Sequence, residues 1–465
     1  MTVIGSGPNG LVAAITMARA GRRVTVLEAA ATPGGGCRTA ELTEPGFRHD
    51  VCATVLPLAL GSPALRDLPL TAHGVLWIHP EIALAHPLED GTALLHRSLD
   101  DTAAGLGADG AAWRRLLAPL VRGSGPTDDL LALPSIPRHP VAVARFARVG
   151  LPGAERVARR RLSTPGGRAL FGGLAAHSVL PLDRWFSSGV GLTLAAYAHL
   201  VGWPVAQGGA QTVVDALVAI LREHGGDVVC DHRVDDLAEL PPGIVLADVA
   251  PSALVRMAGE RMPERARRRY ARFRRGPGTF KLDYALSGPV PWTDPAVATA
   301  GTVHVGGTFE EIAEAEATVG RGGHPARPFV LTVQATACDP TRAPAGQHTL
   351  WAYCHVPNGS TVDMTEAVER QIERFAPGFR DVVIARHVTT AGALEAYNAN
   401  CVGGDITGGL SDWRQLVSRP VLSRTPWRTS IPGVYLCSSS TPPGGGVHGM
   451  SGLHAARTAL RDHPN

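Results

Sequence analysis

The sequence predicts an α/β fold, and three blocks of the chain carry that prediction. Residues 2–27 read as a buried strand, a glycine turn, a helix and a second strand. Residues 213–247 read as a helix followed by two strands, and residues 434–460 as a strand, a Gly-rich turn and a helix. Because other strand and helix patterns separate these blocks, we expect one domain assembled from discontinuous segments and a second, mixed α+β domain.

The elements between the blocks define the second domain. Residues 82–97 alternate around the letters EDG, a hairpin turn signal, and Ser98 is expected to cap the helix that follows. Residues 103–199 are helical with Pro and Gly breaks. Further strands are expected at residues 279–286, 302–306, 329–336 and 349–356, and helices at residues 309–319 and 363–375.

The composition excludes several classes of protein. The 465 residues hold 44 Lys and Arg against 41 Asp and Glu, and a net charge of +3 is too balanced for a protein that mainly binds nucleic acid. Seven cysteines without a CxxC pair predict reduced thiols in a cytoplasmic protein, and we expect no signal peptide. No grouping of His, Cys, Asp and Glu has metal-ligand spacing, so no metal is expected.

The first block contains GSGPNG at residues 5–10, a G-x-G-x-x-G motif that follows a strand and opens a helix. Its glycines permit a tight turn and close approach to a pyrophosphate, and the helix N-terminus offers N–H groups to the anion. Glu28 ends the second strand and can accept hydrogen bonds from ribose hydroxyls. The predicted dinucleotide contacts are Gly5, Gly7, Pro8, Asn9, Gly10 and Glu28.

Residues 29–39, AAATPGGGCRT, resemble the FAD superfamily that includes phytoene desaturases, flavin amine oxidases and the GDP-dissociation inhibitors of Rab proteins. In that family a Gly-Gly-Arg follows the ribose acid and folds over the FAD phosphates. This chain has Gly36 in place of the Arg, so Arg38 is either the phosphate partner or part of a surface salt bridge. The resemblance implies a Rossmann-type FAD-binding domain of residues 1–60, 205–256 and 425–465 and a substrate domain of residues 61–204 and 257–424.

Two further segments carry the resemblance. Residues 434–452 resemble the last FAD-binding segment of phytoene-desaturase-like proteins, and residues 207–234 resemble the stretch that meets adenine. Cys52 and residues 351–355 also have counterparts in the phytoene-dehydrogenase-like flavoproteins. The resemblance implies further FAD contacts at Gly35, Gly36, Arg38, Val234, Ser440, Gly446, Val447 and Met450.

The resemblance also implies a function. A desaturase or dehydrogenase of this kind passes a hydride from a largely apolar small molecule to flavin N5, and oxygen, a quinone or another acceptor then reoxidises the flavin. Three alternatives stay open: a flavin amine oxidase, a redox-neutral flavin isomerase, and a non-enzymatic lipid-binding protein like the GDP-dissociation inhibitors. A disulfide reductase is disfavoured because Cys37 and Cys52 are fifteen residues apart in separate segments.

Two residues are candidates for the chemistry. Lys281, the only lysine, shares one face of the strand at 279–286 with Asp283, and a solvent-exposed ion pair is the simpler interpretation. Flavin amine oxidases carry a Lys on a similar strand that holds a water at flavin N5, and the resemblance gives Lys281 that role. His448 opens the last helix and acts as an acid or base or packs against the cofactor. Weaker candidates are His177, His355 and Tyr353.

Two stretches raise the question of membrane contact. Residues 187–214 carry no Asp, Glu, Lys or Arg, but Gly and Pro interrupt them, so we expect a buried helix rather than a span. Residues 261–275 hold eight Arg and one acid. A solvated helix face is the default interpretation of this cluster, and peripheral docking on an anionic membrane is the alternative.

Overall fold

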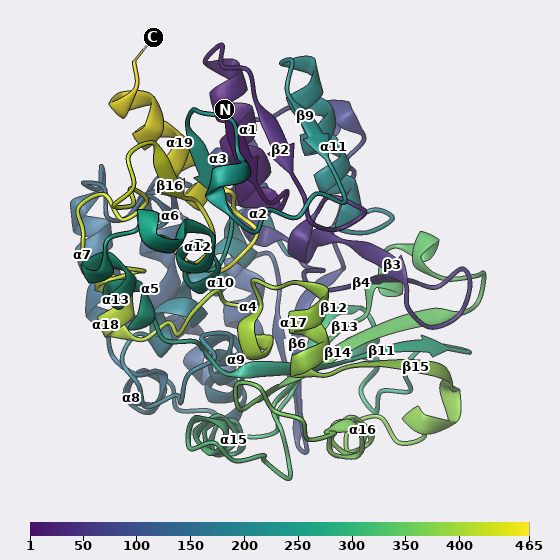
Figure 1. Cartoon of the computed structure of the whole chain (residues 1–465). Helices are drawn as coiled ribbons and strands as arrows, with labels where there is room; N and C mark the ends of the chain where they lie inside the picture. The colour runs from purple at the N-terminus through teal and green to yellow at the C-terminus, as the bar shows by residue number, and fades with distance from the viewer. Residues whose placement is uncertain (465) are drawn as a thin grey trace.

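The computed structural model describes residues 1–464 and confirms the α/β fold (Figure 1). Five parallel strands form one Rossmann-type sheet in the order β16-β10-β1-β2-β9. These strands come from all three blocks that the sequence analysis identified. Their bounds are β1 (Thr2–Ile4), β2 (Thr25–Leu27), β9 (Asp227–Val229), β10 (Val245–Ala247) and β16 (Val434–Leu436).

Both faces of this sheet are covered by apolar cores. Successive strand residues point to opposite faces, so Val3 packs into one core and Ile4 into the other. A parallel sheet buried on both faces explains why its strands read as short, continuous apolar runs. The first core holds helices α1 (Pro8–Arg19), α11 (Gln211–Glu223) and α19 (Met450–Asp462), and the second holds α12 (Pro251–Ala258) and α13 (Glu264–Ala271).

Helices α1 and α19 approach each other so closely that one glycine is required. A Cβ at Gly452 would overlap the carbonyl oxygen of Asn9 and lie 3.1 Å from the amide nitrogen of Ala13. We expect Gly452→Ala to lower the free energy of unfolding by about 3 kcal/mol, because backbone must move to relieve the overlap. Denaturant unfolding measures this. The matched control is Gly392→Ala on a short helix with open space around it, which is expected to leave stability unchanged or raise it.

The second domain is built on a mixed sheet of seven strands in the order β15-β11-β14-β13-β12-β6-β7. All neighbours are antiparallel except β12 and β6, which are parallel. The hairpin at residues 82–97 and the four later strands are thereby confirmed, and Ser98 accepts a hydrogen bond from the Asp101 amide as a helix cap. The bounds are β6 (Ile82–Leu88), β7 (Gly91–Leu95), β11 (Gly278–Leu286), β12 (Ala300–Val305), β13 (Val330–Val333), β14 (His348–Val356) and β15 (Val383–Thr389).

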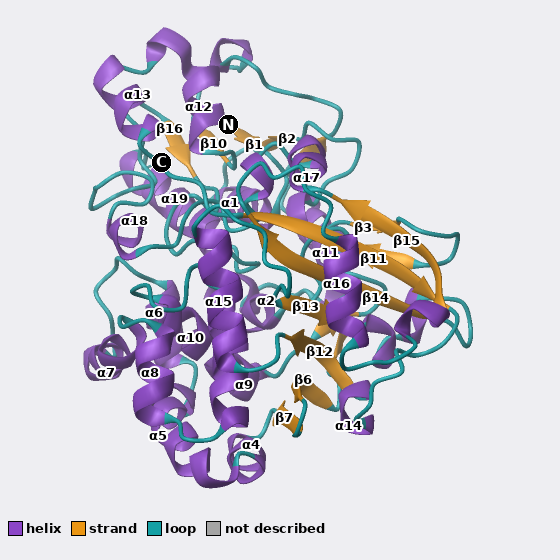
Figure 2. Ribbon diagram, turned by 90° about the horizontal axis from the view of Figure 1, so that it is seen from below, coloured by secondary structure: helices purple, strands orange, loops and turns teal. Residues whose placement is uncertain are grey.

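Helices lie on both sides of the mixed sheet, as Figure 2 shows. One side packs against α9, α10 and α15, and the other against α16. Helix α10 is a buried helix that ends before Gly202. Within residues 1–464, no helix combines the length and the apolar composition that a membrane crossing needs. The helices of the second domain include α4 (Leu99–Gly105), α5 (Gly110–Val121), α6 (Gly125–Leu131), α7 (Pro140–Gly150), α8 (Ala154–Arg161), α9 (Pro165–Ala176), α10 (Ser187–Val201), α15 (Phe309–Gly320), α16 (Thr365–Glu373), α17 (Ala391–Tyr397) and α18 (Trp413–Val417).

Strand β11 is buried along its whole length, which corrects the solvent-face interpretation of Lys281. The strand lies inside the sheet, between β14 and β15. Lys281 is 2% exposed and Asp283 is fully buried. Strand β15, which the sequence analysis missed, pairs with β11 and covers one edge of it. The residues of β15 alternate between half-buried and exposed, as is usual for an edge strand.

Candidate functional site

The glycine loop lies at the carboxyl end of the parallel sheet, where β1 stands between β2 and β10 and the strand order reverses. Gly5 has φ +92°, which favours glycine, and Gly7 is the N-cap of α1. A Cβ at Gly35 would lie 3.1 Å from the Cα of Gly7, so the two predicted glycine segments meet at the N-terminus of α1. Beside them, the buried Oδ1 of Asn9 has no hydrogen-bond partner in the described chain. The glycine backbone at the N-terminus of α1 forms a cradle that suits an anion, and Asn9 Oδ1, an acceptor, suits a donor such as a hydroxyl group.

Glu28 lies beside the loop, at the carboxyl end of β2, and its carboxylate gathers donors from three segments. Oε2 accepts from the amide of Ser6 at 2.9 Å and from its hydroxyl at 2.5 Å. Oε1 accepts from the amide of Ala30 at 2.9 Å and from Arg38 at 3.2 Å. A carboxylate fixed in this way presents its remaining lone pairs to hydroxyl groups. Its predicted role toward ribose stays a prediction.

Arg38 is buried, so the surface salt bridge considered for it is wrong. Its Nη2 donates to the Glu28 carboxylate. Both Nη2 and Nε donate to the carbonyl of Thr32, at 2.7 Å and 3.0 Å. The guanidinium lies 5.4 Å from the centre of the Tyr397 ring. These contacts orient Arg38 toward the ribose acid and the 32–34 turn. A direct phosphate contact stays a prediction.

Asp248 belongs to the cradle, although the sequence analysis did not identify it. It follows β10, and its Oδ2 accepts from the Gly10 amide at 3.0 Å and would lie 2.9 Å from a Cβ at Gly7. Burial raises the pKa of Asp248 to about 7. The hydrogen bond from Gly10 opposes this rise, and the negative charge of Glu28 adds to it. A carboxyl group beside a pyrophosphate must be neutral to avoid charge repulsion, and this environment favours the neutral form.

We expect Asp248→Asn to abolish a pH dependence of cofactor retention. Above about pH 7 the wild-type carboxyl group ionises and repels the pyrophosphate, so retention should fall with rising pH, whereas the amide stays neutral. The raised pKa also predicts that wild-type stability falls between about pH 4 and pH 7. Dialysis at pH values below and above 7, with the absorbance of the released dinucleotide, measures the first effect. Asp235→Asn, an exposed Asp beside Arg233, is the control. Parallel losses from wild type and Asp248→Asn would contradict the prediction.

The C-terminal turn between β16 and α19 brings the last predicted contacts to the same end of the sheet. The Ser440 hydroxyl donates to the Gly408 carbonyl at 2.8 Å, and Val447 packs against the core around α1. Gly446 has φ +121°. Met450 begins α19 and is buried in the core beside α1. On the opposite edge, Val234 is buried beside Ile4.

His448 uses both ring nitrogens to hold this turn. Nδ1 accepts from the Met450 amide at 3.0 Å, so Nε2 donates to the Gly444 carbonyl at 3.1 Å. Burial lowers the pKa of His448 to about 4, and the ring is therefore neutral near pH 7. This geometry favours a structural role. Acid or base chemistry at His448 stays a prediction.

The second cluster lies around Lys281 on the mixed sheet. Its Nζ donates to Asp283 Oδ2 and lies 5.5 Å from the centre of the Trp351 ring, while Asp283 Oδ1 lies 3.6 Å from Nδ1 of His49. Burial raises the pKa of Asp283, and the Lys281 ammonium opposes that rise. Burial and the same ammonium lower the pKa of His49 to about 3. The cluster thus holds one buried cation beside one acid and a neutral imidazole.

A short hairpin connects this cluster to the glycine cradle. Strands β3 (Thr39–Glu41) and β4 (Arg48–Asp50) pair, and His49 belongs to β4. Asp50 accepts from the Thr39 hydroxyl at 2.6 Å and the Ala210 amide at 2.8 Å, and it forms a buried ion pair with Arg342. Segments from both domains are therefore fixed to one carboxylate between the two clusters.

Cys37 and Cys52 face each other, which corrects the expectation that they lie apart. The pairing of β3 and β4 continues through two 2.9 Å hydrogen bonds, from the Val51 amide to Arg38 and from the Ala53 amide to Gly36, so the two cysteines occupy opposed positions. Both thiols are free. Burial raises the pKa of both, and the Lys281 ammonium opposes this only at Cys52. Such thiols form little thiolate, which disfavours disulfide exchange.

A row of histidines, three buried and one half-buried, lies between the mixed sheet and α9 and α15, and it includes the weaker candidates His177 and His355. His355 Nδ1 lies 2.9 Å from both carboxylate oxygens of Glu316. Nε2 of His177 lies 3.1 Å from Nε2 of His304, and Nε2 of His86 donates to a backbone carbonyl at 2.7 Å. Burial lowers the pKa of His177 to about 3 and of His86 to about 4, so these two rings are neutral near pH 7. The alternation of strand residues brings His86, His304 and His355 to one face of the sheet, and His177, which follows α9, lies next to His304.

Comparisons with known proteins agree with this geometry. Residues 3–68 match the family described as an NAD(P)-binding Rossmann-like domain. The rat protein named pyridine nucleotide-disulfide oxidoreductase domain-containing protein 2 is 26% identical over 553 residues, covering 100% of this chain and 93% of that protein. A component of limonene dehydrogenase from Castellaniella defragrans is 39% identical over 101 residues, which cover 22% of this chain and 18% of that protein.

A solved double mutant of putrescine oxidase has the same fold. It superposes with a TM-score of 0.63 over 100% of this chain and 98% of that chain, at 16% sequence identity. At this identity the likeness concerns the fold. The chain therefore carries a Rossmann-like dinucleotide-binding domain within an α/β fold of one parallel and one mixed sheet, which putrescine oxidase shares.

Proposed function

We propose that the protein is an FAD-dependent oxidoreductase that removes a hydride from a largely apolar organic molecule. The observation that carries this proposal is the connection between the two clusters. The Glu28 cradle and the buried Lys281 pair come from different domains, and the β3–β4 hairpin links them through His49 and Asp50. A dinucleotide held in the cradle would thus have one end near anion-binding amides and the other directed toward the mixed sheet.

The residues present fit FAD on three observations. The glycine cradle leaves no room for a Cβ at Gly10, the Glu28 carboxylate is already ordered by its neighbours, and Asn9 Oδ1 lacks a partner among the described residues. Gly5, Gly7, Gly10 and Gly35 would hold the pyrophosphate, and Glu28 the ribose. FAD bound here would supply a two-electron acceptor at its N5 atom.

Lys281 gives the second cluster its chemistry. Its ammonium is removed from solvent and held by Asp283, so it can orient a water or a polar group without competition from bulk water. Lys281 is the only lysine of the chain, and its ammonium is a more compact charge than the guanidinium groups at the other basic positions. We assign to Lys281 the role of orienting a water molecule next to the reacting centre.

An apolar substrate agrees with the walls of the second domain. The face of the mixed sheet toward α9 and α10 carries leucine, valine and aromatic side chains beside the row of histidines. The Castellaniella relative is named for dehydrogenation of limonene, which supports a hydrocarbon-like substrate for this chain. We expect the substrate to lie on this face of the sheet.

The test is an anaerobic screen of the FAD-loaded protein. Terpenes, polyenes and other apolar compounds are mixed with the enzyme, and the visible flavin absorbance is followed. Bleaching by an apolar compound, with a dehydrogenated product identified by mass spectrometry, supports the proposal. A purified protein that takes up no flavin would refute it.

An amine oxidase is the second candidate, and the buried position of Lys281 on β11 favours it. The same screen separates the two functions. Bleaching by primary amines or diamines, with no response to any apolar compound and with aldehyde formation, would establish amine oxidation and contradict the substrate class proposed above.

A further inference from the structure

Exposed apolar side chains gather on one side of the molecule, away from both clusters. Three of them, Leu133, Ile136 and Val141, lie on the connection from α6 to α7 and at the start of α7. Three more, Trp413, Val417 and Leu422, lie on and after α18. Figures 1 and 2 both place α7 and α18 on the same side of the molecule. We call these six residues the docking face.

The exposure of these side chains is unusual for their size. Ile136 is 93% exposed and Leu422 is 75% exposed, and Trp413 is half exposed. Single exposed apolar residues are common on protein surfaces. A set of six on two segments nearly 280 residues apart indicates a surface that contacts another apolar surface.

The same side carries positive charge that the protein does not neutralise. Within residues 1–464, seven exposed arginines around the docking face form no ion pair with an acid, whereas Arg114 pairs with Asp100 and Arg274 pairs with Asp412 beside Trp413. Arg414 instead lies over the ring of Trp413, at 5.5 Å from its centre. These unpaired arginines are Arg115, Arg122, Arg138, Arg145, Arg148, Arg414 and Arg424.

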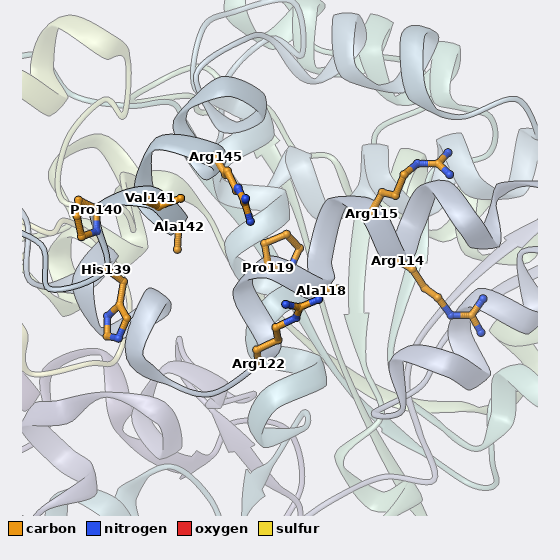
Figure 3. Close-up of a pocket in the computed structure, with 10 residues that line it drawn as sticks. All are labelled: Arg114, Arg115, Ala118, Pro119, Arg122, His139, Pro140, Val141, Ala142 and Arg145. Atoms are coloured by element: carbon orange, nitrogen blue, oxygen red, sulfur yellow. The ribbon is translucent and has the colours of Figure 1, made fainter.

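A groove of about 660 Å³ between α5 and α7 combines both properties. Its apolar lining comes from Ala118, Pro119 and Val141, and Figure 3 shows Arg122 and Arg145 extending into the space between the two helices. Cationic side chains at the rim of an apolar groove complement an anionic headgroup that is attached to a hydrocarbon chain.

The Arg-rich segment at residues 261–275 supplies positive charge but no exposed large apolar side chain. Helix α13 exposes Arg265, Arg268 and Arg269, and Arg272 directly after it is also exposed, while the one large apolar residue of the helix, Tyr270, is buried. It lies on the same side of the molecule as α7 and α18 in both Figures 1 and 2. Charge without apolar insertion gives weak, salt-sensitive attraction.

We infer that the docking face binds the surface of an anionic lipid bilayer. Ile136, Trp413 and Leu422 enter the boundary between headgroups and acyl chains, and the surrounding arginines contact lipid phosphates. Binding is peripheral, because the apolar residues come from loops and short helices that are too small to span a bilayer. The inference stands independently of the reaction proposed above.

Sedimentation of the full chain with vesicles tests it. Vesicles of phosphatidylcholine alone are compared with vesicles that contain about a third phosphatidylglycerol, at low and high salt. Wild type should sediment with the anionic vesicles only. Ile136→Asp should weaken binding roughly ten-fold, because it removes an apolar side chain that enters the bilayer, and Arg145→Glu at least five-fold.

Matched variants on the far side of the molecule serve as controls. Ile384→Asp on the edge strand β15 and Arg370→Glu on α16 make the same chemical changes, and both residues lie outside the docking face. Neither should change binding. If wild type does not bind anionic vesicles, or if both control variants weaken binding as much as Ile136→Asp, the inference fails.

Two other outcomes would also overturn it. If Arg268→Glu abolishes binding and Ile136→Asp does not, α13 alone attracts the membrane and the docking face plays no part. If wild type is a dimer and Ile136→Asp is a monomer in size-exclusion chromatography, with vesicle binding unchanged, the docking face is an interface between two copies of the chain. All these residues are exposed, so the variants should fold.

Discussion

Glu28→Ala is expected to yield a folded protein that does not retain FAD. The Glu28 carboxylate is held by the Ser6 amide and hydroxyl, by the Ala30 amide and by Arg38, so its oxygens are fixed at the end of β2. Loss of two charge-assisted hydrogen bonds to ribose should weaken binding by roughly a hundred-fold or more. The ratio of protein to flavin absorbance after gel filtration measures this.

The substitution has a second effect that must be separated from the first. Without Glu28, the buried guanidinium of Arg38 loses its only acidic partner among the described residues, and stability should fall. Glu28→Gln keeps the shape of the side chain and removes only the charge, so it should bind FAD more weakly than wild type but more tightly than Glu28→Ala. Glu41→Ala, at an exposed position on β3, controls for the general loss of a carboxylate. A folded Glu28→Ala protein with full FAD occupancy would rule out the ribose contact.

The cradle illustrates which parts of the site a sequence reveals. The glycine loop, helix α1 and Glu28 lie within 28 residues, and each is recognised from its immediate neighbours. Asp248 reaches the same loop from 238 residues away, through a parallel strand pairing that no local pattern encodes. Its sequence context, a single acid after a short apolar strand, resembles an ordinary strand end. Local motifs were therefore predictable, and the long-range member of the same cradle was not.

The second sheet shows the same division. Its strands other than β15 were predictable because their apolar periodicity is local, but the burial of Lys281 depends on partners from distant segments. His49 and Trp351 cover it from β4 and β14, and β15 protects the edge of its strand. An alternating pattern cannot distinguish a solvent face from a face covered by another domain. The opposed positions of Cys37 and Cys52 were missed for a different reason: they follow from the pairing of β3 with β4, which was not predicted.

Lys281→Met is expected to retain FAD and to slow flavin reduction or reoxidation by roughly a hundred-fold, since positioned acid–base groups contribute on that order. Reoxidation can be measured without a known substrate, by reducing the bound flavin with light and mixing it with oxygenated buffer. The substitution leaves Asp283 buried without its cation, which should cost several kcal/mol of stability and further raise the pKa of Asp283.

A double variant separates the role of the ammonium in the reaction from its role in the fold. Lys281→Met with Asp283→Asn removes both charges of this pair, so stability should return toward that of wild type. If Lys281 acts only by neutralising Asp283, the double variant should also recover normal flavin kinetics. If the ammonium orients a group at the reacting centre, as we propose, the double variant should be stable and remain slow. The comparison of stability with rate in these variants therefore decides whether the only lysine of the chain serves the fold alone or also the reaction.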